Sequence, residues 1–248
     1  MAKKLKIQHS FQRFEKKYLL TQAQYAALLD GMSPYLEPDE YGHYTICNLY
    51  YDTDNYQLIR ASLEKPVYKE KLRMRSYGVP GNGDNVFVEL KKKFHGEVYK
   101  RRVVMEVSEA AHYLSGTARP CQEGQICHEI DWFLHSYHPT PKVFIACHRE
   151  AWAGRNDSEL RVTFDTNLRW RDKDLDLRLG DAGQPILPQD CILMEIKIPG
   201  AAPVWLARLL SELKVYPTSF SKYGTYYKQQ ILGQTAPQKI HLEVMTCA

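Results

Sequence analysis

The sequence has no apolar run long enough to cross a membrane, and no apolar stretch follows its basic first residues as it would in a secretory signal peptide. We therefore expect a cytoplasmic protein without a membrane span. The six cysteines form no C-x-x-C pair and have no zinc-ligand spacing, so free thiols are expected. The net charge of +4 is too small to require a nucleic-acid partner.

No internal repeat, low-complexity tract or long linker divides the chain. A hydrophobic fraction of 44% and a charged fraction of 25% are typical of a soluble globular protein. A chain of 248 residues can bury one sizeable core. We expect a single domain over residues 1–248, with a core of about 9–233 and a C-terminal tail of 234–248.

The most informative stretch is the strongly basic segment 69–77. Side chains alternate between the two faces of a strand, so Lys71, Arg73 and Arg75 share one face. Leu72 and Met74 lie on the opposite face. The segment therefore predicts a strand with one cationic and one apolar face.

The same alternation recurs along the chain, in the segments 15–17, 89–91, 100–102, 161–165 and 195–197. A charged solvent face would explain any single strand, but Arg and Lys dominate here, and polar uncharged residues are scarce on these faces. Strands that close into a barrel could pack their apolar faces against helices and direct the charged faces into a shared lumen. The expected fold is α+β: an antiparallel β-barrel with helices packed outside and a lumen that binds polyanions.

Local signals give the expected elements. A capping box, Thr21 to Gln24, opens a helix that ends near Met32, and Asp54 is a candidate N-cap for the next helix. Further helices are expected after Ser108 and over 122–137, 202–213 and 225–232. Strands are expected over 11–20, 43–52, 69–77, 86–94, 97–105, 142–150, 159–169, 175–179 and 191–198.

Several motifs appear in an order that resembles one family. They are Phe14-Glu15-Lys16-Lys17-Tyr18, Leu49-Tyr50-Tyr51-Asp52-Thr53, Lys71-Leu72-Arg73-Met74-Arg75 with Tyr77-Gly78, Phe87-Val88-Glu89-Leu90-Lys91, Lys100-Arg101-Arg102, Arg161 with Asp165-Thr166, Met194-Glu195-Ile196-Lys197 and Phe220-Ser221-Lys222-Tyr223. Over about residues 9–233 the chain resembles the VTC domain, in a compact bacterial-type form. That family is named for the vacuolar transporter chaperone complex and includes its polyphosphate polymerase subunit. It lies within the CYTH-like triphosphate tunnel metalloenzymes, whose barrel encloses a charged tunnel.

The resemblance implies a role for each matched position. The residues implied in catalysis are Arg73, Arg75, Lys91, Arg149 and Lys197. Those implied in substrate binding are Arg13, Lys17, Lys71, Lys100, Arg102, Arg161 and Lys222. Glu195, with Glu89 and Glu15, would bind Mn²⁺ or Mg²⁺. The implied ligands are ATP and inorganic polyphosphate, and a membrane protein is a candidate partner.

One departure from the superfamily bears on the reaction. The CYTH triphosphatases open with Glu-x-Glu-x-Lys, whereas Arg13 precedes Glu15 and Lys17 here. Loss of a carboxylate weakens metal activation of water and adds a phosphate anchor, which favours a polymerase that moves the γ-phosphoryl group of ATP onto polyphosphate. The alternatives are a tunnel triphosphatase acting on tripolyphosphate or a nucleoside triphosphate, and a non-catalytic module that binds polyphosphate or inositol phosphate.

A crowded cationic lumen should also destabilise the protein when no ligand is bound. On this basis, Arg73→Met or Arg75→Met is expected to raise the melting temperature of the ligand-free protein and to weaken its stabilisation by tripolyphosphate.

Overall fold

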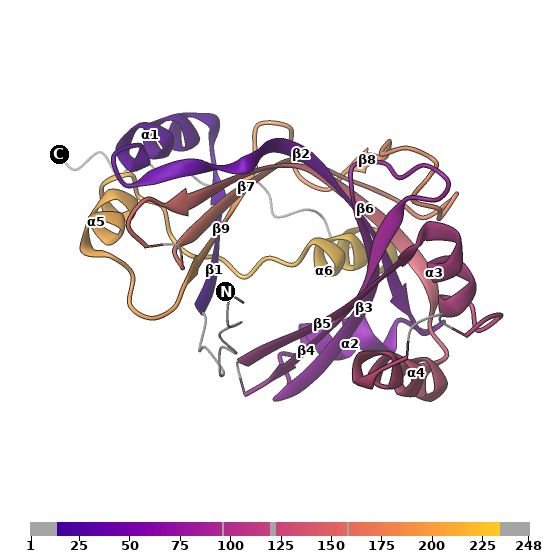
Figure 1. Cartoon of the computed structure of the whole chain (residues 1–248). Coiled ribbons are helices and arrows are strands. Elements are labelled where there is room, and N and C mark those ends of the chain that lie inside the picture. Colours follow the sequence, from indigo (N-terminus) through magenta and orange to yellow (C-terminus); the bar gives the residue numbers. More distant parts are fainter. Residues whose placement is uncertain (1–13, 96, 120–122, 158, 234–248) are drawn as a thin grey trace, which may run out of the picture.

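The computed structural model describes residues 14–95, 97–119, 123–157 and 159–233. In this part of the chain nine strands form one antiparallel sheet, ordered β1-β9-β7-β6-β2-β3-β4-β5 with β8 paired to β7 (Figure 1). The strands are β1 (Phe14–Leu20), β2 (Leu36–Asp52), β3 (Tyr68–Tyr77), β4 (Asn85–Phe94), β5 (Glu97–Glu106), β6 (Thr140–Gly154), β7 (Arg161–Arg171), β8 (Gln184–Pro185) and β9 (Ile192–Ile198). The helices are α1 (Gln22–Met32), α2 (Gln57–Leu63), α3 (Val107–Leu114), α4 (Gln125–Tyr137), α5 (Val204–Glu212), α6 (Lys222–Tyr226) and the π-helix η1 (Tyr227–Ile231).

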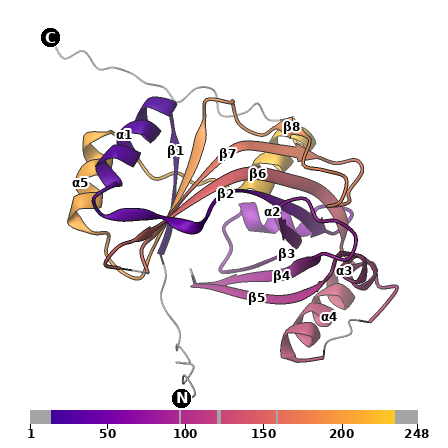
Figure 2. The same cartoon turned by 45° about the horizontal axis from the view of Figure 1, so that its top comes forward.

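The sheet curls strongly, so that β1 and β5, its two edge strands, approach the same opening (Figures 1 and 2). Among the described residues β1 and β5 do not pair, so the barrel is curled without being closed by strand pairing. An ion pair of 3.7 Å between Lys91 Nζ on β4 and Glu15 Oε2 on β1 spans the opening. The α+β class and the antiparallel tunnel-like sheet are thus confirmed, with an open seam in place of complete closure.

Two hydrophobic clusters lie on the outer face of the curled sheet. In one cluster α3 and α4 cover β3, β4 and β5 through residues such as Ile130, Phe133 and Leu72. In the other, α1 and α5 cover β1, β7 and β9 through residues such as Leu28 and Leu206. These helices lie outside the barrel as expected, because the apolar positions of each strand alternate with the charged ones.

A third cluster lies on the inner face. There α6 and η1 place Tyr223, Tyr226 and Tyr227 against Ile145 and Leu193 of the sheet. The expected outside packing thus holds for α1, α3, α4 and α5, whereas α6 and η1 lie on the inner face. These two helices follow the bend after Pro217 and fill one part of the interior, which leaves the charged positions in the remaining part.

Local signals were confirmed at some elements and wrong at others. The capping box of α1 is present, because Thr21 and Gln24 each bond the other's backbone N–H. The expected N-cap Asp54 does not cap α2: Asp52 accepts hydrogen bonds from the backbone N–H groups of Leu58 and Ile59, both at 2.9 Å. Asp52 is buried at the end of β2 and can reach the first turn of α2 from there.

The expected strand over 175–179 does not form, and this segment is a loop. Arg171 organises it by donating hydrogen bonds to four backbone carbonyls, those of Asp174, Asp176, Gly180 and Ala182. A strand there would have to give up these bonds.

Four cysteines of the described residues, Cys47, Cys127, Cys147 and Cys191, are buried free thiols, as expected. Cys121 and Cys247 lie outside the described residues. No helix in the described part of the chain combines the length and apolarity that a membrane span requires.

Candidate functional site

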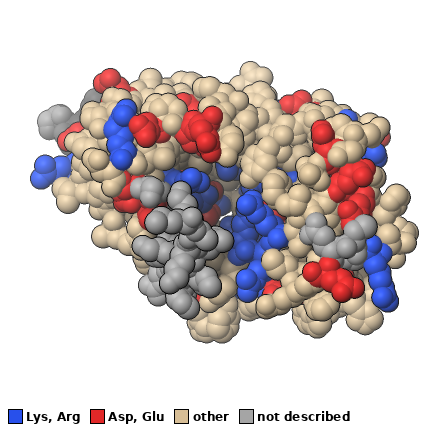
Figure 3. All heavy atoms as spheres, viewed as in Figure 1, with Lys and Arg blue, Asp and Glu red and all other residues tan. Residues whose placement is uncertain are grey.

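Strand register places the predicted cations on one face of the sheet. Cross-strand partners on this inner face include Glu15 with Lys197, Lys17 with Glu195, Lys71 with Lys91, Arg73 with Glu89, Lys91 with Lys100, Glu89 with Arg102, Arg149 with Asp165 and Arg161 with Lys197. Figure 3 shows Lys and Arg side chains gathered around a hollow at the centre of the molecule. We call this set of inner-face residues the cationic site.

Glu89 of β4 holds one group of cations together. Its side chain is 1% exposed, and Arg73 binds Oε2 through Nε at 2.8 Å and Nη2 at 2.7 Å. Lys100 Nζ lies 2.6 Å from Oε1, and Arg75 Nε lies 3.7 Å from Oε2. Burial opposes ionisation of Glu89, but Arg73, Arg75 and Lys100 lower its pKa to about 2. Glu89 therefore orients the Arg and Lys side chains that surround it.

Asp165 of β7 holds a second group. It is fully buried, and Arg149 binds it through two hydrogen bonds of 2.6 and 2.7 Å while Lys222 Nζ binds it at 2.6 Å. Burial opposes its ionisation, yet Lys222 and Arg149 hold its pKa well below the usual range. The sequence did not predict Asp165 as a site residue. The available signal in the sequence was its spacing, because Arg161, Thr163 and Asp165 alternate with apolar residues and therefore share one strand face.

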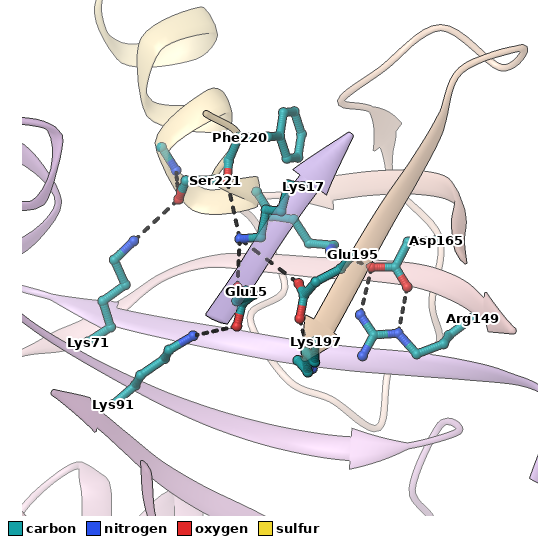
Figure 4. A network of polar contacts seen from close by, with 12 residues as sticks. Glu15, Lys17, Lys71, Lys91, Arg149, Asp165, Glu195, Lys197, Phe220 and Ser221 are labelled. Carbon is teal, nitrogen blue, oxygen red and sulfur yellow. Dashed lines mark hydrogen bonds and ion pairs between the residues drawn. The ribbon is translucent and has the colours of Figure 1, made fainter. Parts of the chain in front are cut away.

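Two carboxylates meet between β1 and β9 (Figure 4). Lys17 Nζ lies 3.3 Å from Glu15 Oε1 and 4.0 Å from Glu195 Oε2, and it donates to the carbonyl of Phe220 at 3.2 Å. Lys197 Nζ lies 2.8 Å from Glu195 Oε1. Burial and the charge of Glu195 raise the pKa of Glu15, but Lys91 and Lys17 outweigh them, so the net shift is downward.

This pair of carboxylates is the place where a divalent cation fits. Within the described residues no three His, Cys, Asp or Glu side chains are arranged to hold a metal ion. Mg²⁺ commonly takes only one or two protein carboxylates and completes its shell with water and substrate phosphate oxygens. Glu195 and Glu15 satisfy that requirement, whereas Glu89 lies on β4 within its own group of cations.

Lys71 differs from the other cations of the site. Its ammonium donates to Ser221 Oγ at 3.3 Å, and no carboxylate of the described residues lies within 4.0 Å of it. Burial, followed by the charges of Lys69, Lys17, Lys91 and Arg73, lowers its pKa to about 7. Lys71 is thus the clearest place where like charges oppose one another.

Lys71→Met, which removes the charge and keeps an unbranched side chain, should raise the melting temperature of the ligand-free protein at and below neutral pH. Because the pKa of Lys71 is about 7 in the folded state and about 10.4 in an unfolded chain, only the unfolded chain keeps this proton between those values. Wild-type stability should therefore rise with pH across this window, and the variant should lack that contribution. Thermal melts from about pH 6 to about pH 10 measure the difference.

The matched control is Lys16→Met, which removes an exposed charge from the same region on the outer face of β1. It should leave the pH dependence unchanged. A Lys71→Met protein with the pH slope of the wild type would show that Lys71 keeps its proton in the folded state.

The expectation for Arg73 needs correction. Although burial disfavours its charge, Tyr50 and Glu89 raise its pKa above the ordinary value, so its charge is well supported. Arg73→Met would leave the buried Glu89 with fewer partners, so we do not expect this substitution to raise the melting temperature. The prediction stands for Arg75, because burial and Arg73 lower its pKa.

The remaining predicted residues lie toward the rim. Arg102 and Arg161 are exposed, and the Arg102 guanidinium carbon lies 4.8 Å from the centroid of the Phe87 ring. Arg13 lies outside the described residues. Further side chains join the site without a clear signal in the sequence: Asn48 accepts from Arg75 Nε at 2.8 Å, and Tyr50 accepts from Arg73 Nη1 at 3.3 Å.

Solved structures share this fold. A putative adenylyl cyclase from Hippeastrum, HpAC1, described as having a dominant triphosphatase activity, matches with a TM-score of 0.55 and 14% identity over 91% of this chain and 98% of that one. A putative adenylate cyclase from Bacillus halodurans matches with a TM-score of 0.51 and 14% identity over 84% of this chain and 92% of that one. The curled antiparallel sheet of this chain is thus a fold that it shares with these two structures.

Sequence relatives point to one family within that fold. Subunit 4 of the vacuolar transporter chaperone complex is 26% identical in Trypanosoma brucei brucei (strain 927/4 GUTat10.1) and 25% identical in Trypanosoma cruzi (strain CL Brener), over 73% of this chain in each case. The chain spans 27% of the length of each relative. The family model of the VTC domain matches residues 12–231. The chain therefore belongs to the VTC domain family.

Proposed function

We propose that the protein is a divalent-metal-dependent phosphotransferase that moves the γ-phosphoryl group of ATP onto the end of an inorganic polyphosphate chain. The observation that carries the proposal is the cationic site itself, in which Arg and Lys from separate strands face one hollow. Arg offers a planar fork that matches phosphate oxygens, and Lys offers a mobile point charge. Phosphoryl transfer depends mainly on positioning and on neutralising charge.

The residues divide into two tasks. On the inner face, Arg73, Arg75, Lys91, Arg149 and Lys197 would neutralise charge on the transferring group, while Lys17, Lys71, Lys100, Arg102, Arg161 and Lys222 would bind the rest of the nucleotide and polymer phosphates. Arg13 is proposed as a further anchor. Glu89 and Asp165 fix the directions of the Arg and Lys side chains that they bind.

Glu195 and Glu15 would hold Mn²⁺ or Mg²⁺ between them and the substrate. A bound divalent ion would neutralise charge on phosphate oxygens during transfer. Lys17 and Lys197, which contact these carboxylates in the ligand-free protein, could then turn toward phosphate oxygens.

The carboxylates favour polymerisation over hydrolysis. A hydrolase must deprotonate water, and a general base works best with a pKa near the working pH. Burial alone would raise the pKa values of Glu15, Glu89, Asp165 and Glu195, yet the surrounding cations lower all four. The terminal phosphate of polyphosphate is already an anion and needs no such base. Lys71 would regain its proton beside a bound polyanion and could not serve as the base.

The test is incubation of the purified protein with γ-labelled ATP, a short polyphosphate primer and Mn²⁺. We expect labelled long polymer and ADP, with free phosphate as a minor product. Release of free phosphate alone would support the triphosphatase, and tight binding without turnover would support the binding module. Arg155→Met is a suitable control, because Arg155 is an exposed outer residue paired with Glu37.

A membrane-protein partner and a cytoplasmic location stay predictions. The relatives are subunits of a vacuolar complex, and this chain covers only the matching part of them.

A further inference from the structure

Aromatic side chains continue the inner face beyond Arg75. Tyr77 follows Arg75 by two positions on β3, and Phe87 lies opposite Arg75 on β4. Tyr44 lies opposite Arg149. The rings form a row, with centroid distances of 5.9 Å from Tyr44 to Tyr77 and 5.6 Å from Tyr77 to Phe87. We call Tyr44, Tyr77 and Phe87 the aromatic shelf.

Tyr77 makes the shelf accessible, whereas Tyr44 and Phe87 are half-buried and Tyr44 also packs against one hydrophobic cluster. Tyr77 is 51% exposed, and Tyr41, which is 70% exposed, extends the row at 6.4 Å from Tyr44. Neither Tyr77 nor Phe87 belongs to any of the hydrophobic clusters. Tyr44 and Phe87 meet Tyr77 at interplanar angles of 62° and 82°, so neither ring stacks face to face on Tyr77.

Position also separates the shelf from other exposed aromatics. Phe14, Tyr68 and Phe94 are about half exposed, but strand alternation places them on the outer face. Tyr77 instead combines an exposed ring with a place on the inner face, two positions after Arg75. Arg102, whose guanidinium lies over Phe87, joins the rings to the cationic site.

We propose that the aromatic shelf binds the base of the nucleoside triphosphate. This inference rests on the proposed function. It gives a binding site for the base of the donor nucleotide, which phosphate-binding cations cannot recognise. Successive positions on one strand face are about 6.6–6.8 Å apart. A base on Tyr77 would therefore place the ribose beside Arg75 and Arg102, with the phosphates continuing toward Arg73 and the Glu15–Glu195 pair.

The shelf would give the site a means to distinguish its two substrates. Every nucleobase has a flat π face that stacks on an aromatic side chain, whereas inorganic polyphosphate has none. The donor nucleotide would thus be held at the Tyr77 end, and the polymer would occupy the cations toward Lys71 and Lys91. Binding of ATP would depend on the shelf, and binding of inorganic tripolyphosphate would not.

The experiment measures equilibrium binding of two probes: the non-hydrolysable analogue adenosine 5′-(β,γ-imido)triphosphate, and inorganic tripolyphosphate. Tyr77→Ala should weaken binding of the analogue by at least about fivefold, the lower end expected for loss of one base–aromatic stack. Its affinity for tripolyphosphate should stay within about twofold. Tyr77→Phe, which keeps the ring, should bind both probes like the wild type.

Tyr99→Ala is the matched control, because Tyr99 is 44% exposed on the outer face of β5. It should change neither affinity. Three results would contradict the proposal that the aromatic shelf binds the base. They are an equal effect of Tyr77→Ala on both probes, no effect on either probe, and no binding of the analogue by the wild type. Failure of the proposed function is a separate result: an enzyme that releases only free phosphate can still show the selective loss in Tyr77→Ala.

Discussion

Glu195→Gln should lower turnover by at least about 100-fold, because the change removes a carboxylate that would hold the metal against the transferring phosphate. Glutamine keeps the size of the side chain and a hydrogen-bond acceptor, and Glu195 lies at a buried position of β9 where shape matters. The fold should persist. The measurement is the initial rate of polymer formation from γ-labelled ATP at saturating Mn²⁺.

Binding without metal separates this role from simple ion pairing. Glu195 lies 2.8 Å from Lys197 and 4.0 Å from Lys17, so its neutralisation increases the positive charge of the site. Tripolyphosphate should therefore bind the variant at least as tightly as the wild type when a chelator is present. Weaker binding, or normal turnover, would show that Glu195 is not the metal ligand.

Glu129→Gln provides the control. Glu129 is a carboxylate on α4 that also binds two cations, Lys92 at 3.0 Å and Arg101 at 3.6 Å, but it lies on the outer side of the sheet. Its neutralisation should leave both turnover and tripolyphosphate binding unchanged.

Much of the fold could be predicted because strand alternation is a local property. Lys71, Arg73 and Arg75 share a face in any strand, and their apolar neighbours then need cover from helices. The open seam between β1 and β5 could not be predicted in the same way. Pairing at the edges depends on how strongly the whole sheet curls, and no residue pattern within one strand records that curvature.

The inner position of α6 and η1 was missed for a similar reason. Tyr223, Tyr226 and Tyr227 indicate an apolar helix face, but they do not say which side of the sheet it covers. The loop at 175–179 was missed because Arg171, close in sequence, donates hydrogen bonds to the carbonyl of Asp176 within it and to those of Asp174 and Gly180 on either side. A short apolar segment alone resembles a strand.

In the site, the sequence predicted which cations face inward better than it predicted their partners. Glu89 and Glu195 have the same spacing to a following Lys, yet Arg73 and Lys100 surround Glu89 while Glu195 lies near Glu15. The difference arises from neighbouring strands that are distant in the chain. Asp165 was missed because one of its partners, Lys222, comes from α6, which follows 57 residues later.

Asp165→Asn should be the most destabilising of these substitutions. Asp165 is fully buried between Arg149 and Lys222, and loss of one partner from a buried ion pair costs about 3–5 kcal/mol because the remaining charges stay uncompensated. At about 2–4 °C per kcal/mol, the melting temperature should fall by roughly 6–20 °C. Asp54→Asn, which changes an exposed carboxylate paired with Lys142, is the control and should have little effect.

The same substitution should enlarge the stabilisation by ligand. With Asp165 neutral, Arg149 and Lys222 lack a counter-charge until a polyanion supplies one, so the melting-temperature shift caused by saturating tripolyphosphate should exceed that of the wild type.

The difference in melting temperature between the ligand-free variant and the ligand-free wild type should also depend on pH. Because Arg149 and Lys222 depress the pKa of Asp165 in the folded state, its contribution is complete above the ordinary Asp pKa of about 3.9 and declines as pH falls further. The melting temperatures of Asp165→Asn and the wild type should therefore differ at neutral pH and converge in acid. A difference that stays constant with pH would show that Asp165 stabilises the fold without its charge.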